Sequence, residues 1–361
     1  MINCTYLHIP FCTTKCFYCA FCSFPLLRLK NDYIGALIKE IKYYYKNNYQ
    51  KTIYFGGGTP SLLNIDELEK ILNCFNFDKN TSITLEANPC ELTREKLENY
   101  KKLGINRISL GVQNFDDDIL KSLNRNHTKN DIFNAVENIL CVGFKDFSID
   151  LMYGLANQNL KQWEDTLNIA LGLDINHISL YGLKIEKGTK FHKFPPKNLP
   201  DNDIQADMYK LACEMLSEKF KHYEFSNFAK SEKHYSKHNL AYWKRENYYG
   251  FGLSASGFID NKRYTNTVNF KNYTENPTGQ NYEVLNFQEQ IEEEIFLGLR
   301  LSEGINFSYL NKKYNIDIYK KYEKQFEKFL KAGFMQKTKN GIKLTLEGVL
   351  LSNEILCEFI D

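Results

Sequence analysis

The stretch CTYLHIPFCTTKCFYC, residues 4–19, decides the fold of this chain. Its first six residues form an apolar and β-branched run that is typical of a buried strand. The residues that follow include Cys12, Cys16 and Cys19, in the spacing C-x3-C-x2-C. We therefore predict a strand that ends in a compact loop of cysteines.

Three thiolates in one tight loop can converge on an iron–sulfur cluster. A four-iron cluster with only three cysteine ligands leaves one iron open to a chelating cofactor, so we predict a [4Fe-4S] cluster on Cys12, Cys16 and Cys19. The alternative is a closed zinc site that adds Cys22 and needs no cofactor. The separation between Cys19 and Cys22 is the same as that between Cys16 and Cys19. Spacing alone therefore does not show whether Cys22 is a ligand.

Short apolar runs alternate with helical patterns beyond this loop, which is typical of repeated βα units. The predicted strands span residues 4–9, 52–55, 82–86, 107–110, 147–150 and 177–180. We predict an α/β fold with a partial (β/α)6 barrel. A smaller, mainly helical C-terminal domain with a winged-helix-like end should follow it, after the proline-rich stretch 194–200.

The carboxyl ends of the predicted strands carry polar groups. After the cysteine loop, the second strand runs into Gly56–Thr59, the third ends on Glu86, the fourth leads to Gln113 and the fifth ends on Asp150. Because these ends meet at one rim of a parallel barrel, we expect them to build a single site.

The composition of the chain disfavours some classes of partner. The 361 residues carry a formal net charge of +2 with both signs interspersed, which does not favour nucleic acid as a partner. No apolar run is long enough to cross a bilayer, and no signal peptide precedes the first strand. We expect a cytoplasmic protein whose scattered cysteines are reduced.

Several segments together resemble the radical S-adenosylmethionine superfamily, and within it the HemN and HemW families. The first is YLHIPFC, residues 6–12, with the cysteine spacing described above. The others are YFGGGTP at 54–60, LEANP at 85–89, GINRISLGVQ at 104–113 and DLMYGL at 150–155. The likeness extends over nearly the whole chain.

The resemblance implies that the methionyl amine and carboxylate of S-adenosylmethionine chelate the fourth iron, and that reduction then releases a 5′-deoxyadenosyl radical. Acidic groups suit the amine or ribose hydroxyls of this cofactor, and an arginine suits its carboxylate. A glycine run alone is equally typical of a simple turn. The residues that match the family positions for this cofactor are Tyr6, Gly57, Gly58, Thr59, Glu86, Gln113, Arg125 and Asp150.

Residues 238–243, HNLAYW, match the HNxxYW motif that HemW-like proteins are thought to use for haem. The resemblance makes His238 a candidate axial ligand, with Tyr242 and Trp243 flanking the macrocycle. A hydrogen-bonded histidine beside two packed aromatic side chains is the alternative. On this basis we divide the chain into a core barrel, residues 1–225, and a haem region, residues 226–361.

Two features favour HemW over HemN. Only five residues precede Tyr6, which leaves no room for the N-terminal extension expected of HemN, and Phe21 stands where HemN has a fourth cysteine. The chain also departs from the HemW pattern. It lacks a histidine in the run 250–257, and Lys237 replaces the usual arginine before His238. Ala156-Asn157 replaces the usual Pro-Gly.

The resemblance implies a haem chaperone that passes haem to an acceptor protein, for example a respiratory enzyme. The alternative is an oxygen-independent coproporphyrinogen III oxidase, so whether the chain acts as an enzyme stays open. Radical modification of RNA or protein is a third class, which the C-terminal half does not favour. Transient membrane contact and a homodimer are further expectations for its partners.

Overall fold

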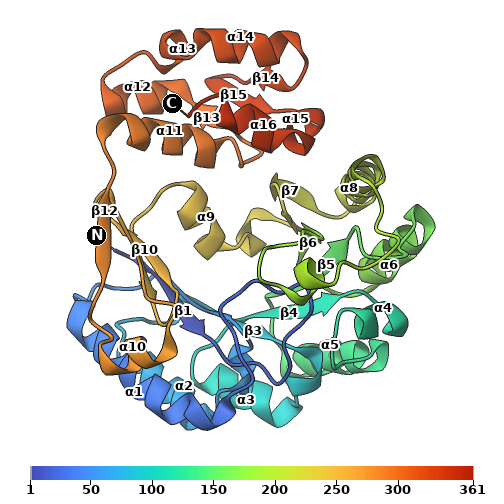
Figure 1. Ribbon diagram of the computed structural model, residues 1–361, viewed down its shortest axis with the longest axis vertical. Coiled ribbons are helices and arrows are strands. Elements are labelled where there is room, and N and C mark those ends of the chain that lie inside the picture. The colour runs from blue at the N-terminus through green and yellow to red at the C-terminus, as the bar shows by residue number, and fades with distance from the viewer. Residues whose placement is uncertain (1, 361) are drawn as a thin grey trace.

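The computed structural model describes residues 2–360, and a curved sheet of twelve strands dominates it (Figure 1). Its order is β12-β11-β10-β9-β1-β2-β3-β4-β5-β6-β8-β7. The six central strands run parallel. They are β1 (Cys4–Ile9), β2 (Thr52–Gly57), β3 (Ser82–Ala87), β4 (Arg107–Gln113), β5 (Phe147–Tyr153) and β6 (His177–Gly182). All six predicted strands are confirmed, which establishes the α/β barrel core.

Helices cover the outer, convex side of this sheet (Figure 1). Alternate strand residues, such as Leu7, Phe55 and Leu85, are fully buried against them. The polar residues between these positions therefore face the inner side. The helices that follow the central strands are α1 (Lys30–Tyr44), α2 (Ile65–Leu72), α3 (Arg94–Lys102), α4 (Asp117–Ser122), α5 (Lys129–Val142), α6 (Leu160–Gly172), α7 (Lys190–Lys193) and α8 (Asn202–Ser217).

Short strands extend the sheet at both ends, and the sequence pattern did not predict them. The additional strands are β7 (Lys221–Glu224), β8 (Asn227–Ala229), β9 (Tyr248–Phe251), β10 (Ser256–Ile259), β11 (Lys262–Thr265) and β12 (Asn281–Val284). β9 pairs in parallel with β1, and β10, β11 and β12 continue antiparallel. The sheet therefore continues to residue 284, while the division of the chain at residue 225 stays a proposal.

Helix α9 (Lys237–Trp243) lies on the inner side of the curved sheet (Figure 1). A hydrogen bond of 2.8 Å joins Thr52 Oγ1 on β2 to His238 Nδ1 on this helix. Ser236 caps the helix by accepting from the N–H of Asn239. The HNxxYW segment is thus held against the inner face of the strands that carry the cysteine loop and the glycine run.

Residues from α11 onward form a C-terminal unit with a core of its own, which includes Ile291, Ile295, Phe326 and Phe359. Helices surround a three-stranded sheet of order β13-β15-β14, so the predicted smaller, mainly helical domain is confirmed. Its elements are α11 (Phe287–Gly298), β13 (Ile305–Asn306), α12 (Phe307–Tyr314), α13 (Ile318–Lys321), α14 (Glu323–Lys331), β14 (Met335–Lys337), β15 (Gly341–Leu344), α15 (Leu346–Leu350) and α16 (Ser352–Cys357); α10 (Phe270–Glu275) precedes them.

None of the helices that the structure describes combines the length and the apolar character of a membrane span.

Candidate functional site

A cavity of about 460 Å³ lies at the carboxyl ends of the parallel strands. It is the place where the predicted cluster and cofactor residues meet, although they come from five strand ends. The predicted residues among those that line it are Cys12, Cys16, Cys19, Gly57, Gly58, Thr59, Glu86, Gln113, Arg125 and Asp150. The rule that parallel strands deliver their polar groups to one rim therefore describes this chain well.

The three cysteines share the cavity wall with groups that donate to sulfur. Thr59 Oγ1 lies 3.6 Å from Cys12 Sγ, and Arg125 Nη1 lies 3.4 Å from Cys16 Sγ. Such donors stabilise thiolates, which are the form that binds metal. Nowhere in residues 2–360 do three His, Cys, Asp or Glu side chains already stand close enough together to hold a metal ion. The three thiols and the donors beside them are a donor set that fits an iron–sulfur cluster.

Within residues 2–360, Arg125 is a half-buried cation with no carboxylate in ion-pair distance. Its Nη2 donates to Asn88 Oδ1 and to the carbonyl of Gly111, both at 2.7 Å, while Nε is buried and unpaired. Burial lowers the pKa of Arg125, but Tyr18 and Cys16 outweigh that effect and raise it above its ordinary value. The guanidinium therefore keeps its charge and can receive an anionic group in the cavity.

Two half-buried carboxyl groups, Glu86 and Asp150, face the same cavity. Burial, reinforced by the charge of Asp150, raises the pKa of Glu86 to about 7, although the Tyr54 hydroxyl donates to it at 2.8 Å. Burial likewise raises the pKa of Asp150 to about 6. A cationic or hydroxyl-bearing ligand would favour the ionised form of both groups. Perturbed pairs of this kind are typical of functional sites.

The glycine run packs directly against the cysteine loop. A Cβ on Gly58 would lie 2.6 Å from the carbonyl oxygen of Phe11, so only glycine fits there. The N–H groups of Gly58 and Thr59 donate to the carbonyls of Ile9 and Phe11 at 2.8 and 2.7 Å. Both N–H groups already have acceptors within the chain, so a bound cofactor would contact other atoms of this turn.

Tyr6 does not reach the cavity wall. Its hydroxyl lies 3.1 Å from His8 Nδ1, and its ring is 6.2 Å from Tyr54 and 6.4 Å from His238. It therefore lies on the inner face between the cavity and the HNxxYW helix. Of the eight residues matched to the cofactor, it is the one that this geometry separates from the others.

His238 is buried and has hydrogen-bond partners on both ring nitrogens. Nδ1 lies 2.8 Å from Thr52 Oγ1 and Nε2 lies 2.7 Å from the Tyr242 hydroxyl. The ring stacks on Tyr54 with centroids 4.9 Å apart. Burial lowers the pKa of His238 to about 3, so the ring is neutral. A neutral imidazole is the form that binds iron, but a nitrogen must first exchange its present partner.

Trp243 points in another direction. The Arg300 guanidinium lies 4.4 Å from its ring, and the indole Nε1 is buried without a partner. The three residues matched to haem therefore do not line one surface, since His238 and Tyr242 face the barrel while Trp243 faces Arg300.

Known proteins match this chain over its whole length. The model of the radical SAM superfamily matches residues 6–170, and that of the HemN C-terminal domain matches residues 285–351. The protein named heme chaperone HemW in Bacillus subtilis is 37% identical over 98% of both chains. Heme chaperone HemW of Lactococcus lactis is 35% identical, over 99% of this chain and 97% of its own.

This chain belongs to the HemW family of radical SAM proteins. A solved structure of coproporphyrinogen III oxidase (HemN) from Escherichia coli superposes on the HemW-family fold of this chain with a TM-score of 0.86. That match covers 99% of this chain and 90% of the other at 21% sequence identity, so it supports the fold.

Asn88 and Tyr181 also line the cavity of this HemW-family chain, and neither was predicted from the sequence to be a site residue. Asn88 accepts from Arg125 and donates to Thr59 Oγ1 at 3.2 Å, so it joins the predicted anion site to the glycine turn. Both residues follow or end a parallel strand. Applying the strand-end rule to the sixth strand as well would have found Tyr181.

Proposed function

We propose that this chain is a cytoplasmic haem chaperone, which binds haem and transfers it to an acceptor protein. The observation that carries the proposal is the full-length similarity to proteins named heme chaperone HemW, at 37% and 35% identity. The cysteine-lined cavity supports the same function because it brings together the cysteines and polar groups that the cluster and cofactor of a radical SAM family member would need. In this proposal residues 1–225 hold that cofactor site and residues 226–361 hold haem.

Cys12, Cys16 and Cys19 would bind a [4Fe-4S] cluster, with S-adenosylmethionine as an exchangeable ligand beside it. The cluster would supply an open iron position and an electron to that cofactor. Arg125 would pair with the cofactor's carboxylate, and Glu86 and Asp150 would accept from its amine or ribose hydroxyls. The unpaired Nε of Arg125 and the raised pKa values of the two carboxyl groups support this assignment.

His238 would ligate haem iron through one ring nitrogen. Before it binds iron, His238 would break its hydrogen bond to the hydroxyl of Thr52 or of Tyr242. That hydroxyl would then form a hydrogen bond with another group of the chain. Tyr242, which lies beside His238, would provide apolar surface for the macrocycle, whereas Trp243 lies on Arg300 instead.

The cluster assignment is tested by anaerobic reconstitution of single variants, with iron, sulfide and zinc measured on each. We expect Cys16→Ala to lose most of its iron and Cys22→Ala to keep it, because only three thiolates are ligands in this proposal. Cys90→Ala is the matched control, since that cysteine is exposed and outside the loop. Stoichiometric zinc without sulfide in the reconstituted wild type would overturn the assignment.

The chaperone function is tested by two assays on one preparation. Haem titration should give a Soret band that His238→Ala weakens and the exposed control His192→Ala does not. Incubation with coproporphyrinogen III, S-adenosylmethionine and a reductant should not give multiple turnovers to protoporphyrinogen IX. Repeated conversion to protoporphyrinogen IX would instead establish the oxidase.

A further inference from the structure

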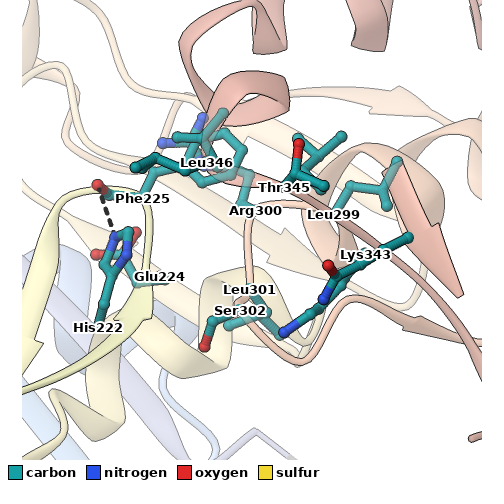
Figure 2. A pocket seen from close by; sticks show the side chains of 13 residues that line it. His222, Glu224, Phe225, Leu299, Arg300, Leu301, Ser302, Lys343, Thr345 and Leu346 are labelled. Carbon is teal, nitrogen blue, oxygen red and sulfur yellow. Dashed lines mark hydrogen bonds between the residues drawn. The ribbon is translucent and has the colours of Figure 1, made fainter. Parts of the chain in front are cut away.

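A second cavity, of about 330 Å³, separates the edge strand β7 from the C-terminal unit. Figure 2 shows His222, Glu224 and Phe225 on one side of it and Lys343 and Thr345 on the other, with Arg300 between them. The backbone also joins the two parts here, because Phe225 N donates to the carbonyl of Arg300 at 3.2 Å. The cavity is therefore built by both parts of the molecule and is distinct from the cysteine-lined one.

Arg300 lies in this cavity with no ion-pair partner among the described residues. Its guanidinium lies between two aromatic rings, 4.8 Å from that of Phe225 and 4.4 Å from that of Trp243. Its Nε is buried and makes no hydrogen bond. Aromatic faces orient a guanidinium but cannot replace the acceptors that its N–H groups need. The side chain is thus fixed in place with hydrogen-bonding capacity unused.

The charged side chains that line this cavity include more cations than carboxyl groups. Lys343 lines it without a carboxylate in ion-pair distance, within the part of the chain that the structure describes. Glu224 is the one carboxyl group among the lining residues, it is 1% exposed, and its Oε2 makes no hydrogen bond within residues 2–360. Burial lowers the pKa of His222, which is thereby kept neutral. Two cations therefore face one carboxyl group.

A carboxylate is the ligand that such a site fits. An arginine fork binds a carboxylate through two parallel hydrogen bonds, and a second cation strengthens the pair where water is excluded. Glu224 in its protonated form can donate to the same ligand, and burial favours that form by raising its pKa. The volume is near the lower limit of small-ligand sites, about 300 Å³, and suits a carboxylate-bearing arm.

We propose that Arg300 and Lys343 bind a propionate group of haem. This inference rests on the proposed haem function, because haem carries propionate groups, while the carboxylate of S-adenosylmethionine is assigned to Arg125 in the other cavity. The link between the two is Trp243, which ends the HNxxYW helix and lies on the guanidinium of Arg300. Arg300 thereby becomes a specificity-determining residue for haem over porphyrins that lack free carboxylates.

The test compares haem with haem dimethyl ester, in which both carboxylates are blocked, by Soret titration in the same solvent. We expect the wild type to bind haem roughly tenfold more tightly than the ester, and Arg300→Gln to reduce this ratio to within about twofold. Affinity for the ester should stay unchanged in the variant. Lys343→Gln should give an intermediate ratio, and Lys339→Gln, outside the cavity lining, should match the wild type.

The outcomes separate this inference from the proposed function. A haem-to-ester ratio that is the same in the wild type, Arg300→Gln and Lys343→Gln would overturn the propionate site while leaving the chaperone intact. A wild type that binds neither porphyrin would overturn the proposed function and this inference with it. Should Arg300→Gln unfold, Lys343→Gln gives the same readout, because its side chain stacks on no aromatic ring of the motif.

Discussion

Glu86 illustrates what the sequence can predict about a residue and what it cannot. Its place at a strand end predicts a side chain on the cavity rim, and the structure puts it there. Its pKa depends on the Tyr54 hydroxyl, the Gly57 N–H and Asp150, which come from other strands. The same limit applies to His238, which the HNxxYW match makes a candidate haem ligand, while only the fold shows that both nitrogens are engaged.

The raised pKa of Glu86 predicts how stability depends on pH. The group's pKa is about 7 in the folded chain against an ordinary value of 4.5, so its contribution is fully present below pH 4.5 and is lost as pH rises through 7. Between pH 5 and pH 8, Glu86 should lower the free energy of unfolding by on the order of 2–3 kcal/mol. Urea unfolding of the apoprotein should show a smaller decrease in Glu86→Gln, whereas the exposed control Glu98→Gln should behave as the wild type.

The contribution of His238 to stability should depend on pH in the opposite direction to that of Glu86. Its pKa is about 3 in the folded chain against 6.5 ordinarily, so its contribution is present above pH 6.5 and is lost as pH falls towards 3. Between pH 7 and pH 5 this histidine should cost about 2 kcal/mol of stability. Urea unfolding at the two pH values checks this. His238→Gln should lose less free energy of unfolding than the wild type, and the control His192→Gln should lose as much as the wild type. Equal losses in all three proteins would contradict the prediction.

At the scale of elements, regular βα units were predictable and the irregular additions were not. The six parallel strands carry apolar runs that are buried on the helical side. Strands β9 to β12 have four residues each, and every residue of β12 is in the exposed class, so no periodicity marks them. The position of α9 inside the sheet follows from contacts such as Thr52 with His238, which join residues 186 positions apart.

Glu40 on α1 should anchor the added strands. Its buried carboxylate accepts from the Tyr273 hydroxyl, the Gly252 N–H and the side chains of Asn266 and Gln280, at 2.6 to 3.0 Å. Glu40→Ala leaves these donors unpaired and should destabilise the fold by about 3–5 kcal/mol. Urea unfolding measures this, with the exposed Glu69→Ala as the control and Glu40→Gln expected between them. A loss below about 1 kcal/mol would show that water replaces the carboxylate.

At the scale of the whole molecule, the two proposed ligand sites share one side chain. The Tyr54 hydroxyl donates to Glu86 Oε1 at 2.8 Å, on the wall of the cysteine-lined cavity. The ring of the same residue stacks on His238 at an interplanar angle of 22°. A ligand that draws the Glu86 carboxylate towards itself therefore acts, through one rigid ring, on the histidine proposed to bind haem. Neither contact follows from sequence spacing, because Tyr54 and His238 meet only in the fold.

Occupancy of the cofactor cavity should consequently change the affinity for haem. Saturating S-adenosylmethionine should shift the haem dissociation constant of the reconstituted wild type several-fold, and haem should shift that of the cofactor by the same factor, because binding linkage is reciprocal. Tyr54→Phe keeps the stacked ring but loses the bond to Glu86, so it should reduce both shifts to within about twofold. Anaerobic Soret titrations with and without the cofactor measure this, and Tyr43→Phe, with its exposed ring, is the matched control. A shift that persists unchanged in Tyr54→Phe would mean that the two sites communicate by another route.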